Sequence, residues 1–181
     1  MELFLKYSGI VGIILMWLFV VFPAFVKKTY VNKKPFSYLG KDGKYAVVFN
    51  FVLVIIMILQ LIFVLYIGLS FGKISLVGMI IFLSGTLLGI LTGVINLKDS
   101  VTIHTNLGFG YFILSSIGAL IISVSFAEKS AIVSFFSVFD VLLLGVGGLV
   151  IYLTTKKIVF AEMWMFVFST IWVCLCLFLP V

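Results

Sequence analysis

The 181-residue chain has 64% hydrophobic and only 10% charged side chains, and its mean hydropathy is +1.40. That composition lies outside the range of soluble domains and is typical of a protein embedded in lipid. The formal charge is +6, and all basic residues are lysines. Because the lysines stand in short loops between apolar runs, they indicate membrane topology and exclude a nucleic-acid-binding protein, which needs a basic face.

Histidine and cysteine content excludes most metal and haem sites. One histidine cannot supply a three-histidine metal site or a bis-histidine haem. Cys174 and Cys176 lie two residues apart in an apolar run, so on a helix they point to nearly opposite sides and form no metal clamp. We therefore expect no metal and no cofactor.

Six apolar runs have about the 20 residues that a spanning helix needs. We predict helices over residues 8–26, 46–71, 74–97, 104–127, 131–154 and 161–180. Most connections are short, so sequential helices should be antiparallel neighbours. The predicted fold class is all-α: a single polytopic membrane domain over residues 1–181, folded as a six-helix antiparallel bundle. A five-helix alternative, with the second and third runs as one re-entrant unit, is disfavoured because Phe71-Gly72-Lys73 is turn-like.

The lysines divide unequally between the two membrane faces. The connections after the first, third and fifth helices carry nine: Lys27, Lys28, Lys33, Lys34, Lys41, Lys44, Lys98, Lys156 and Lys157. The opposite face has Lys6, Lys73 and Lys129. The positive-inside rule therefore predicts a cytoplasmic first loop and both termini outside. The exclusive use of lysine and the 20 phenylalanines are typical of an AT-rich genome, so we expect a prokaryotic cell membrane.

Gly85, Gly89 and Gly93 recur at every fourth residue of the third helix. Small residues at this spacing let two helix backbones approach closely, because no side chain separates them. We predict that these glycines pack inside the bundle. The alternatives are a homodimer interface or a contact with a membrane partner subunit.

Asp140 lies about nine residues into the fifth helix, which at ~1.5 Å per residue is ~14 Å deep, near the membrane midplane. It is the only ionisable residue placed so deeply. We interpret it as a protonated acid that is hydrogen-bonded to a neighbouring helix. A proton-coupled or cation-coupled role, or contact with a ligand, is the alternative.

A second group of polar residues lies toward the lysine-rich face. They are Asn50, Asp99, His104 and Glu162. His104, Gly108, Tyr111 and Ser115 also follow one another along a single face of the fourth helix. We predict that Asn50, Asp99, His104, Tyr111 and Glu162 line a ligand pocket, with a His104–Glu162 ion pair at its opening. The alternative is that they only mark the packed side of the helix and the headgroup region.

Ser37, His104 and either Glu162 or Asp99 have the residue types of a nucleophile, a base and an orienting group. Ser37, however, lies in a loop without the strand-to-helix turn that exposes a nucleophile. The sequence therefore assigns no catalytic residue and favours a protein that is not an enzyme.

Several short motifs resemble a known membrane family. They are Phe36-Ser-Tyr-Leu-Gly40 with Phe49-Asn50, the glycines leading to Asn96-Leu-Lys-Asp99, Ile103-His104-Thr105, and Glu162 followed by Trp172. Over residues 5–178 they resemble the prokaryotic six-helix family called domain of unknown function 998. That family is similar in turn to the eukaryotic group that contains a GPI-anchor lipid-remodelling protein and an autophagy-modulating lysosomal membrane protein.

The resemblance implies a six-helix fold and a function with lipids, and it places Ser37, Asp99, His104 and Glu162 on one side. Two departures stand against it. Many relatives have a proline before the acidic residue that follows the third helix, where this chain has Asn96-Leu97-Lys98. The eukaryotic relatives also imply a first loop that faces away from the cytosol, opposite to the lysine count.

Taken together, the sequence favours a protein that binds a lipid or amphipathic small molecule near one membrane face, with membrane lipids as its partners. Three alternatives stay open. They are a small-molecule transporter or its substrate-binding subunit, a membrane-embedded lipid hydrolase, and a structural partner subunit.

Overall fold

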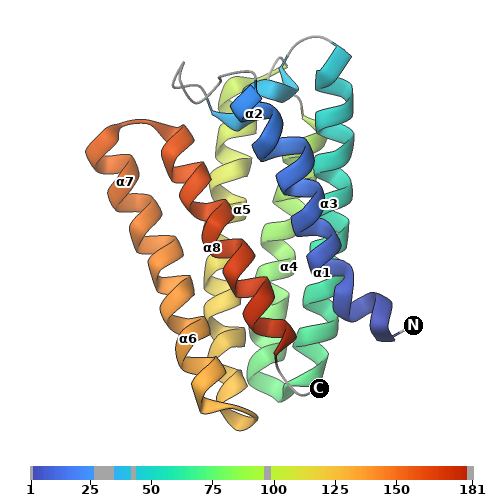
Figure 1. Cartoon of the computed structure of the whole chain (residues 1–181), viewed down its shortest axis with the longest axis vertical. Coiled ribbons are helices and arrows are strands. Elements are labelled where there is room, and N and C mark those ends of the chain that lie inside the picture. The colour runs from blue at the N-terminus through green and yellow to red at the C-terminus, as the bar shows by residue number, and fades with distance from the viewer. Residues whose placement is uncertain (1, 27–34, 42–43, 96–98, 179–181) are drawn as a thin grey trace.

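The computed structural model describes residues 2–26, 35–41, 44–95 and 99–178 (Figure 1). Six spans are long and apolar enough to cross a membrane: Glu2–Val26, Tyr45–Ser70, Gly72–Val94, Val101–Glu128, Ala131–Thr155 and Ile158–Leu177. The predicted all-α, six-helix membrane bundle is therefore confirmed. The predicted ends lie within three residues of the observed ones, except that the first helix begins at Glu2 and not at residue 8.

The spans consist of shorter elements. In chain order these are α1 (Glu2–Met16), η1 (Trp17–Val21), α2 (Phe22–Val26), η2 (Phe36–Gly40), α3 (Lys44–Ser70), α4 (Gly72–Val94), α5 (Val101–Ser125), η3 (Phe126–Glu128), α6 (Ala131–Leu142), η4 (Leu143–Gly147), α7 (Gly148–Thr155) and α8 (Ile158–Leu177). The segments η1 and η4 are π-helical, and η2 and η3 are 3₁₀-helical.

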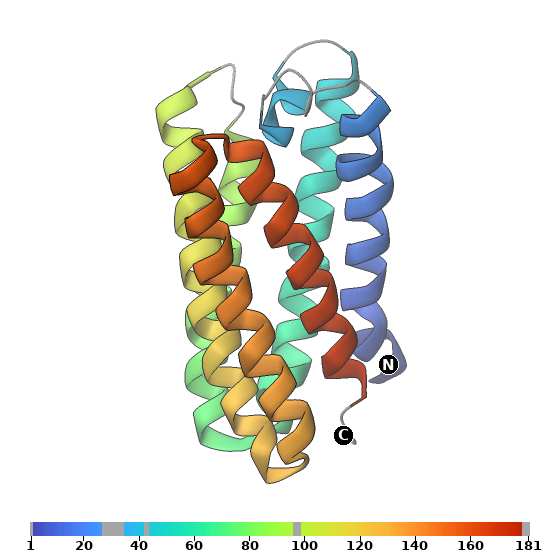
Figure 2. The ribbon, with the colours of Figure 1, turned by 60° about the vertical axis from the view of Figure 1, so that its left-hand side comes forward.

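Successive spans pack side by side, and α8 returns to contact α1, which closes a ring of helices. The start of α1 and the end of α8 lie at the same end of the bundle, which we call the terminal end (Figure 1). The short helix η2 and the turn between α7 and α8 lie at the opposite end, the η2 end (Figure 2).

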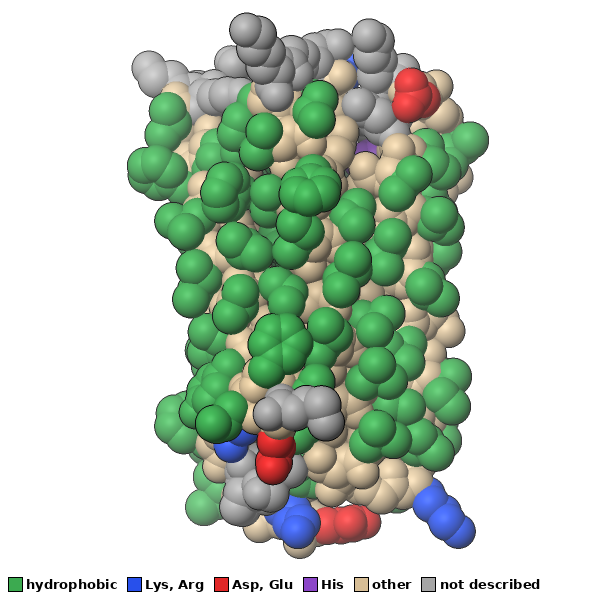
Figure 3. Space-filling view, turned by 90° about the vertical axis from the view of Figure 1, so that its right-hand side faces the viewer, with side chains coloured by type: hydrophobic (Ala, Val, Ile, Leu, Met, Phe, Trp, Pro, Cys, Tyr) green, Lys and Arg blue, Asp and Glu red, His purple; other side chains and the backbone are tan. Residues whose placement is uncertain are grey.

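The face drawn in Figure 3 is apolar along the length of the bundle, and its lysine and acidic side chains lie at the two ends. The buried face of α4 carries mostly small and polar residues instead. On α4 the buried residues are Ser75, Gly78, Met79, Phe82, Gly85, Thr86, Gly89, Thr92 and Gly93. Lipid is as apolar as a leucine side chain, so close packing and hydrogen bonds must hold the helices together.

The closest helix contact joins α4 and α5 at Gly78 and Gly118. A Cβ atom built on Gly118 would lie 2.6 Å from the Phe82 backbone nitrogen and 2.7 Å from the Gly78 carbonyl oxygen. Backbone atoms cannot rotate away, so this contact requires glycine on both helices.

The three predicted glycines of α4 also lie against neighbours within the bundle. A Cβ atom would lie 2.7 Å from Ser115 Oγ at Gly85, 2.6 Å from Met57 Sδ at Gly89, and 2.8 Å from Val54 Cγ2 at Gly93. The row therefore faces α5 at one end and α3 at the other.

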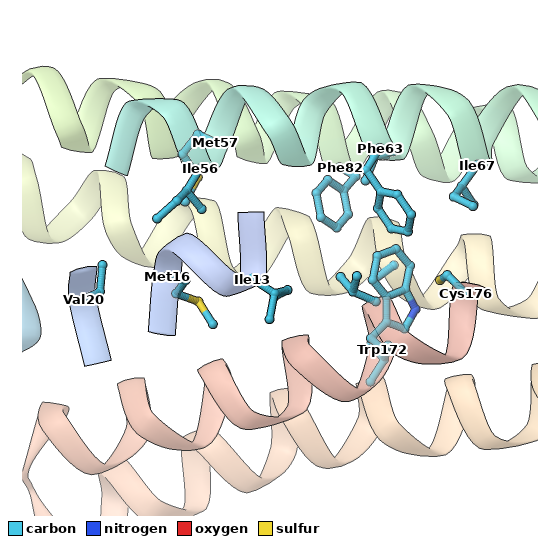
Figure 4. Close-up of a cluster of buried hydrophobic side chains, with 14 of the residues drawn as sticks. Ile13, Met16, Val20, Ile56, Met57, Phe63, Ile67, Phe82, Trp172 and Cys176 are labelled. Carbon is cyan, nitrogen blue, oxygen red and sulfur yellow. The ribbon is translucent and has the colours of Figure 1, made fainter. Parts of the chain in front are cut away.

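An aromatic cluster fills the bundle toward the terminal end (Figure 4). The Trp172 ring stacks on Phe82, with ring centroids 5.8 Å apart, and meets Phe63 edge-on at 6.3 Å. The indole N–H donates to Ser123 Oγ at 2.9 Å, so the polar atom of this buried ring has a partner.

The π-helical segment η1 stands directly before Pro23. Proline has no backbone N–H, so the Phe19 carbonyl loses the partner that an α-helix would give it. The Tyr45 hydroxyl of α3 donates to this carbonyl oxygen at 2.5 Å. Within η1, the Phe22 N–H bonds back to the Trp17 carbonyl, which is the wider π pattern.

The second π-helical segment, η4, has a comparable donor. The Trp164 indole N–H of α8 donates to the Leu143 carbonyl oxygen at 2.8 Å. Gly147 leaves the space for this ring, because a Cβ atom there would lie 2.5 Å from the indole nitrogen. Both irregular turns are thus supported by side chains from other spans.

Tyr45→Phe should lower the free energy of unfolding by about 1–3 kcal/mol, because the Phe19 carbonyl loses its donor inside the membrane. Thermal melting in detergent measures this loss. The exposed Tyr7 provides the matched control, and Tyr7→Phe should leave the melting temperature unchanged. Equal melting temperatures for the two variants would show that the hydroxyl does not support η1.

Candidate functional site

A cavity of about 480 Å³ lies inside the bundle toward the η2 end. Its walls come from α3, α4, α5, η4, α7 and α8, with smaller contributions from α1, η1 and η2. The volume falls within the range of small-molecule pockets, roughly 300–1,000 Å³. Residues distant in the sequence therefore surround one internal space.

Two glycines help to keep this space open. A Cβ atom built on Gly108 of α5 or on Gly145 of η4 would meet no atom within 4 Å, and both residues line the cavity. Their surroundings are the opposite of those at Gly118, where the backbone of α4 fills the space. Glycine thus has two roles in this bundle: close helix contact at Gly118, and open volume at Gly108 and Gly145.

The cavity is lined at the η2 end by Ser37 of η2, His104 of α5 and Glu162 of α8, and also by the hydroxyl residues Thr92 and Thr105. We call Ser37, His104 and Glu162 the mouth. Ser100 Oγ accepts the Ile103 N–H and caps α5, which places His104 in the first turns of the helix. His104 Nδ1 lies 2.9 Å from the Ile95 carbonyl oxygen. Because a carbonyl can only accept, Nδ1 carries the hydrogen and Nε2 is left for another partner.

Glu162 fastens η2 over this end of the bundle. Its Oε2 accepts the Phe36 backbone N–H at 2.6 Å, and the Phe36 ring stacks on Phe166 with centroids 5.6 Å apart. At the other end of η2, the Asn50 side-chain amide donates to the Gly40 carbonyl at 3.2 Å. The short helix is thus held by both α8 and α3 at the η2 end of the bundle (Figure 2), and its Phe36 and Ser37 line the cavity.

The deep end of the cavity is formed by Gln60 and Tyr111, which we call the floor. The Tyr111 hydroxyl donates to Gln60 Oε1 at 2.8 Å. A smaller cavity of about 40 Å³ adjoins the floor and reaches Ser115 and Trp172. Ser115 Oγ has no hydrogen-bond partner in the part of the chain that the structure describes. The main cavity is therefore polar at both ends and aromatic and apolar between them.

The cavity also has an apolar side that faces the bilayer. Phe109 and Ile113 of α5 and Leu149 of α7 line it, yet their side chains are 40%, 58% and 56% exposed. The Phe109 and Tyr152 rings meet edge-on between α5 and α7, with centroids 6.3 Å apart. These exposed side chains bring the cavity lining to the outer surface of the bundle beside α5 and α7, where a membrane-spanning bundle contacts lipid.

The structure brings His104, Tyr111 and Glu162 to one cavity, but not Asn50 or Asp99. Asp99 is exposed in the turn before α5, ahead of the capping residue, and is absent from the cavity lining. Asn50 binds η2 instead. His104 Nδ1 and Glu162 Oε2 each pair with a backbone group, and the ion pair between the two side chains stays a prediction. The polar neighbours Asn96 and Lys98 lie outside the described residues.

Asp140 is buried on α6, with only 4% of its surface exposed. Its Oδ2 has no hydrogen-bond partner among the described residues, and neither has Ser137 Oγ one turn earlier. The predicted hydrogen bond to a neighbouring helix is therefore not made by Oδ2. Asp140 does not line the main cavity.

Asp140→Asn should change the free energy of unfolding by less than about 1 kcal/mol, because it keeps the shape of the side chain and breaks no hydrogen bond of Oδ2. The measurement is thermal melting of this variant in detergent, compared with that of Ser134→Ala. Ser134→Ala removes the bond that Ser134 Oγ donates to the Ser123 carbonyl at 2.8 Å and should cost more. A larger loss for Asp140→Asn would show that the carboxyl group has a structural partner.

Several lining residues were missed from the sequence. Gln60 is the only glutamine of the chain and lies in the middle of an apolar run, so its depth alone could have marked it. Gly145 gave no such signal, because a glycine that opens a cavity and one that closes a contact look alike in a sequence. Gly108, by contrast, belonged to the predicted stripe of the fourth helix, and it lines the cavity.

The arrangement can hold an elongated molecule that has a polar end at the mouth and an apolar body between the mouth and the floor. Comparisons of the chain with family models, with curated proteins and with solved structures find no match.

Proposed function

We propose that this protein binds a lipid or amphipathic small molecule, with the apolar part in the cavity and the polar part at the mouth. The observation that carries the proposal is the cavity itself: about 480 Å³ inside a membrane bundle, polar at one membrane face and lined beside α5 and α7 by side chains that are exposed at the outer surface. A molecule already dissolved in the bilayer can enter by that side without crossing water.

The energetics point to the mouth as the source of selectivity. Moving an acyl chain from lipid into an apolar cavity gains little, because both surroundings are apolar. Hydrogen bonds to buried polar groups gain more, because these groups otherwise have no partner in a water-poor site. Ser37, His104 and Glu162 would supply those bonds to a polar head.

The motif resemblance supports the same proposal. The Phe36–Gly40 run forms η2, whose Phe36 and Ser37 line the cavity, and Ile103-His104-Thr105 opens α5 at the mouth. We propose membership of the family called domain of unknown function 998 on these motifs, and lipid handling is what that membership implies.

Native mass spectrometry after gentle extraction tests the proposal. The wild-type protein should retain a lipid or other amphiphile, and Gly108→Phe should lose most of it, because the new ring occupies the cavity. Val146→Phe adds a ring of the same kind at a residue that is 60% exposed and should retain the ligand. Melting of all three proteins shows that each is folded. Equal retention by the two variants, or no ligand on the folded wild type, would overturn the proposal.

A second candidate is a membrane lipid hydrolase, favoured by one observation. Ser37, His104 and Glu162 all line the same cavity. No hydrogen bond joins Ser37 to His104 in the described structure, so a reacting arrangement would require η2 to shift. Release of fatty acid from a bound ester, lost in Ser37→Ala, would support this candidate, and an ester that stays intact with the wild type would exclude it.

We place the η2 end in the cytoplasm of a prokaryotic cell on the lysine count. Lys157 lies at the η2 end and Lys129 at the terminal end, whereas the lysines of residues 27–34 lie outside the described residues. In a cysteine-free protein, a cysteine at Lys157 should resist a membrane-impermeant thiol reagent in intact cells, and one at Lys129 should react. The reverse pattern would invert the orientation without changing the bundle.

A further inference from the structure

We infer that the cavity takes a lipid with a single acyl chain and a head group that donates hydrogen bonds, such as a monoacylglycerol. This inference rests on the proposed function and narrows its ligand class. Three properties of the site carry it: the volume of the cavity, its depth, and the chemistry of the mouth.

The volume fits one chain. A methylene group takes about the space of a water molecule, ~30 Å³, so 480 Å³ corresponds to about 16 non-hydrogen atoms. A lipid with two chains of similar length needs about twice this volume for its chains alone. Its second chain would have to stay in the bilayer, outside the cavity beside α5 and α7.

The depth agrees with the volume. His104 stands at the mouth and Ser116 near the floor, and both line the cavity. Ser116 stands twelve positions after His104 along α5, which is a rise of ~18 Å at ~1.5 Å per residue. One leaflet contributes about 15 Å, half of the ~30 Å hydrocarbon core. The cavity is therefore about as deep as one leaflet and holds one chain at its natural depth.

The mouth favours a lipid head group that donates hydrogen bonds. The Glu162 carboxyl group brings two acceptor oxygens to the mouth, of which Oε2 already accepts the Phe36 N–H. The hydroxyls of Thr92 and Thr105 also line the cavity and can donate or accept. The Ser37 hydroxyl can act either way. A hydroxyl head group satisfies these acceptors, whereas a carboxylate offers only further acceptors beside Glu162.

The test uses defined lipids and the purified full-length chain. Monoacylglycerols with chains from about 8 to about 20 carbons should bind best near the length of one leaflet, about 16 carbons. A diacylglycerol and a fatty acid of that length should bind at least about tenfold more weakly. Binding is measured by competition with a fluorescent monoacylglycerol.

One variant pair probes the length of the site. Gly145→Leu places a side chain of about four carbons in the deep part of the cavity and should shorten the preferred chain by about four carbons. Val146→Leu, on the exposed side of the same turn, should leave the preference unchanged. If the preferred chain length does not shift in Gly145→Leu, the acyl chain does not occupy this part of the cavity.

The outcomes separate the two proposals. Equal affinity for one-chain and two-chain lipids, still lost in Gly108→Phe, would overturn the single-chain inference and leave the proposed function standing. Tighter binding of the fatty acid would overturn the assignment of the head group. No binding of any lipid by the folded wild type would overturn both.

Discussion

Gly118→Leu is expected to abolish the folded bundle. The first atom of the new side chain would lie 2.6 Å from the Phe82 backbone nitrogen and 2.7 Å from the Gly78 carbonyl oxygen. Inserting atoms into a packed core costs about 1–3 kcal/mol even where side chains can move. Here the opposing atoms are backbone, so we expect a larger loss, and loss of monodisperse protein in detergent chromatography is the measurement.

Leucine substitutions at two other glycines of these helices, Gly108 on α5 and Gly89 on α4, should have smaller effects on stability. Gly108→Leu faces open cavity space and should melt within a few degrees of the wild type, even though it belongs to the same helix as Gly118. Gly89→Leu should fall between them, because it meets the flexible end of Met57. Equal melting of Gly118→Leu and Gly108→Leu would contradict the close contact of α4 and α5.

Glu162→Ala should release η2 from α8 and lower the free energy of unfolding by about 1–3 kcal/mol. That is the usual cost of leaving a buried donor, here the Phe36 N–H, without its acceptor. The released segment should also be cleaved more rapidly by protease. Limited proteolysis and melting measure the two effects together.

Glu162→Gln separates the role of the acceptor from that of the acidic group. The amide oxygen can still accept the Phe36 N–H, so this variant should keep most of the stability and the protease resistance. Asp99→Ala, at an exposed site off the cavity, should behave like the wild type. Equal sensitivity of Glu162→Ala and the wild type would show that η2 is held by its aromatic contacts alone.

The fold followed from the sequence because the signals for spanning helices are strong and local. Runs of about 20 apolar residues allow few alternatives in a bilayer, where every backbone group needs a partner within its own helix. The π-helical segments could not be predicted from the sequence. Pro23 frees the Phe19 carbonyl, but the Tyr45 hydroxyl that supports this carbonyl comes from another span, and such a contact has no local signature.

The candidate site followed only in part, for a physical reason. The stripe from His104 to Tyr111 depends on helical spacing alone, and both residues line the cavity. The predictions for Asn50 and Asp99 rested only on their position near the same membrane face. That position does not decide where a side chain points. The partner of Glu162 is a backbone N–H in η2, and no pattern of side chains could have indicated it.

The central claim is that the cavity, and not only the outer surface, holds a lipid. Photo-crosslinking tests it directly, with a single-chain lipid that carries a photoreactive group in its tail. The account predicts crosslinks to cavity residues such as Phe112 and Leu144, which disappear in Gly108→Phe. Crosslinks confined to outward-facing residues such as Phe135, unchanged in that variant, would contradict it.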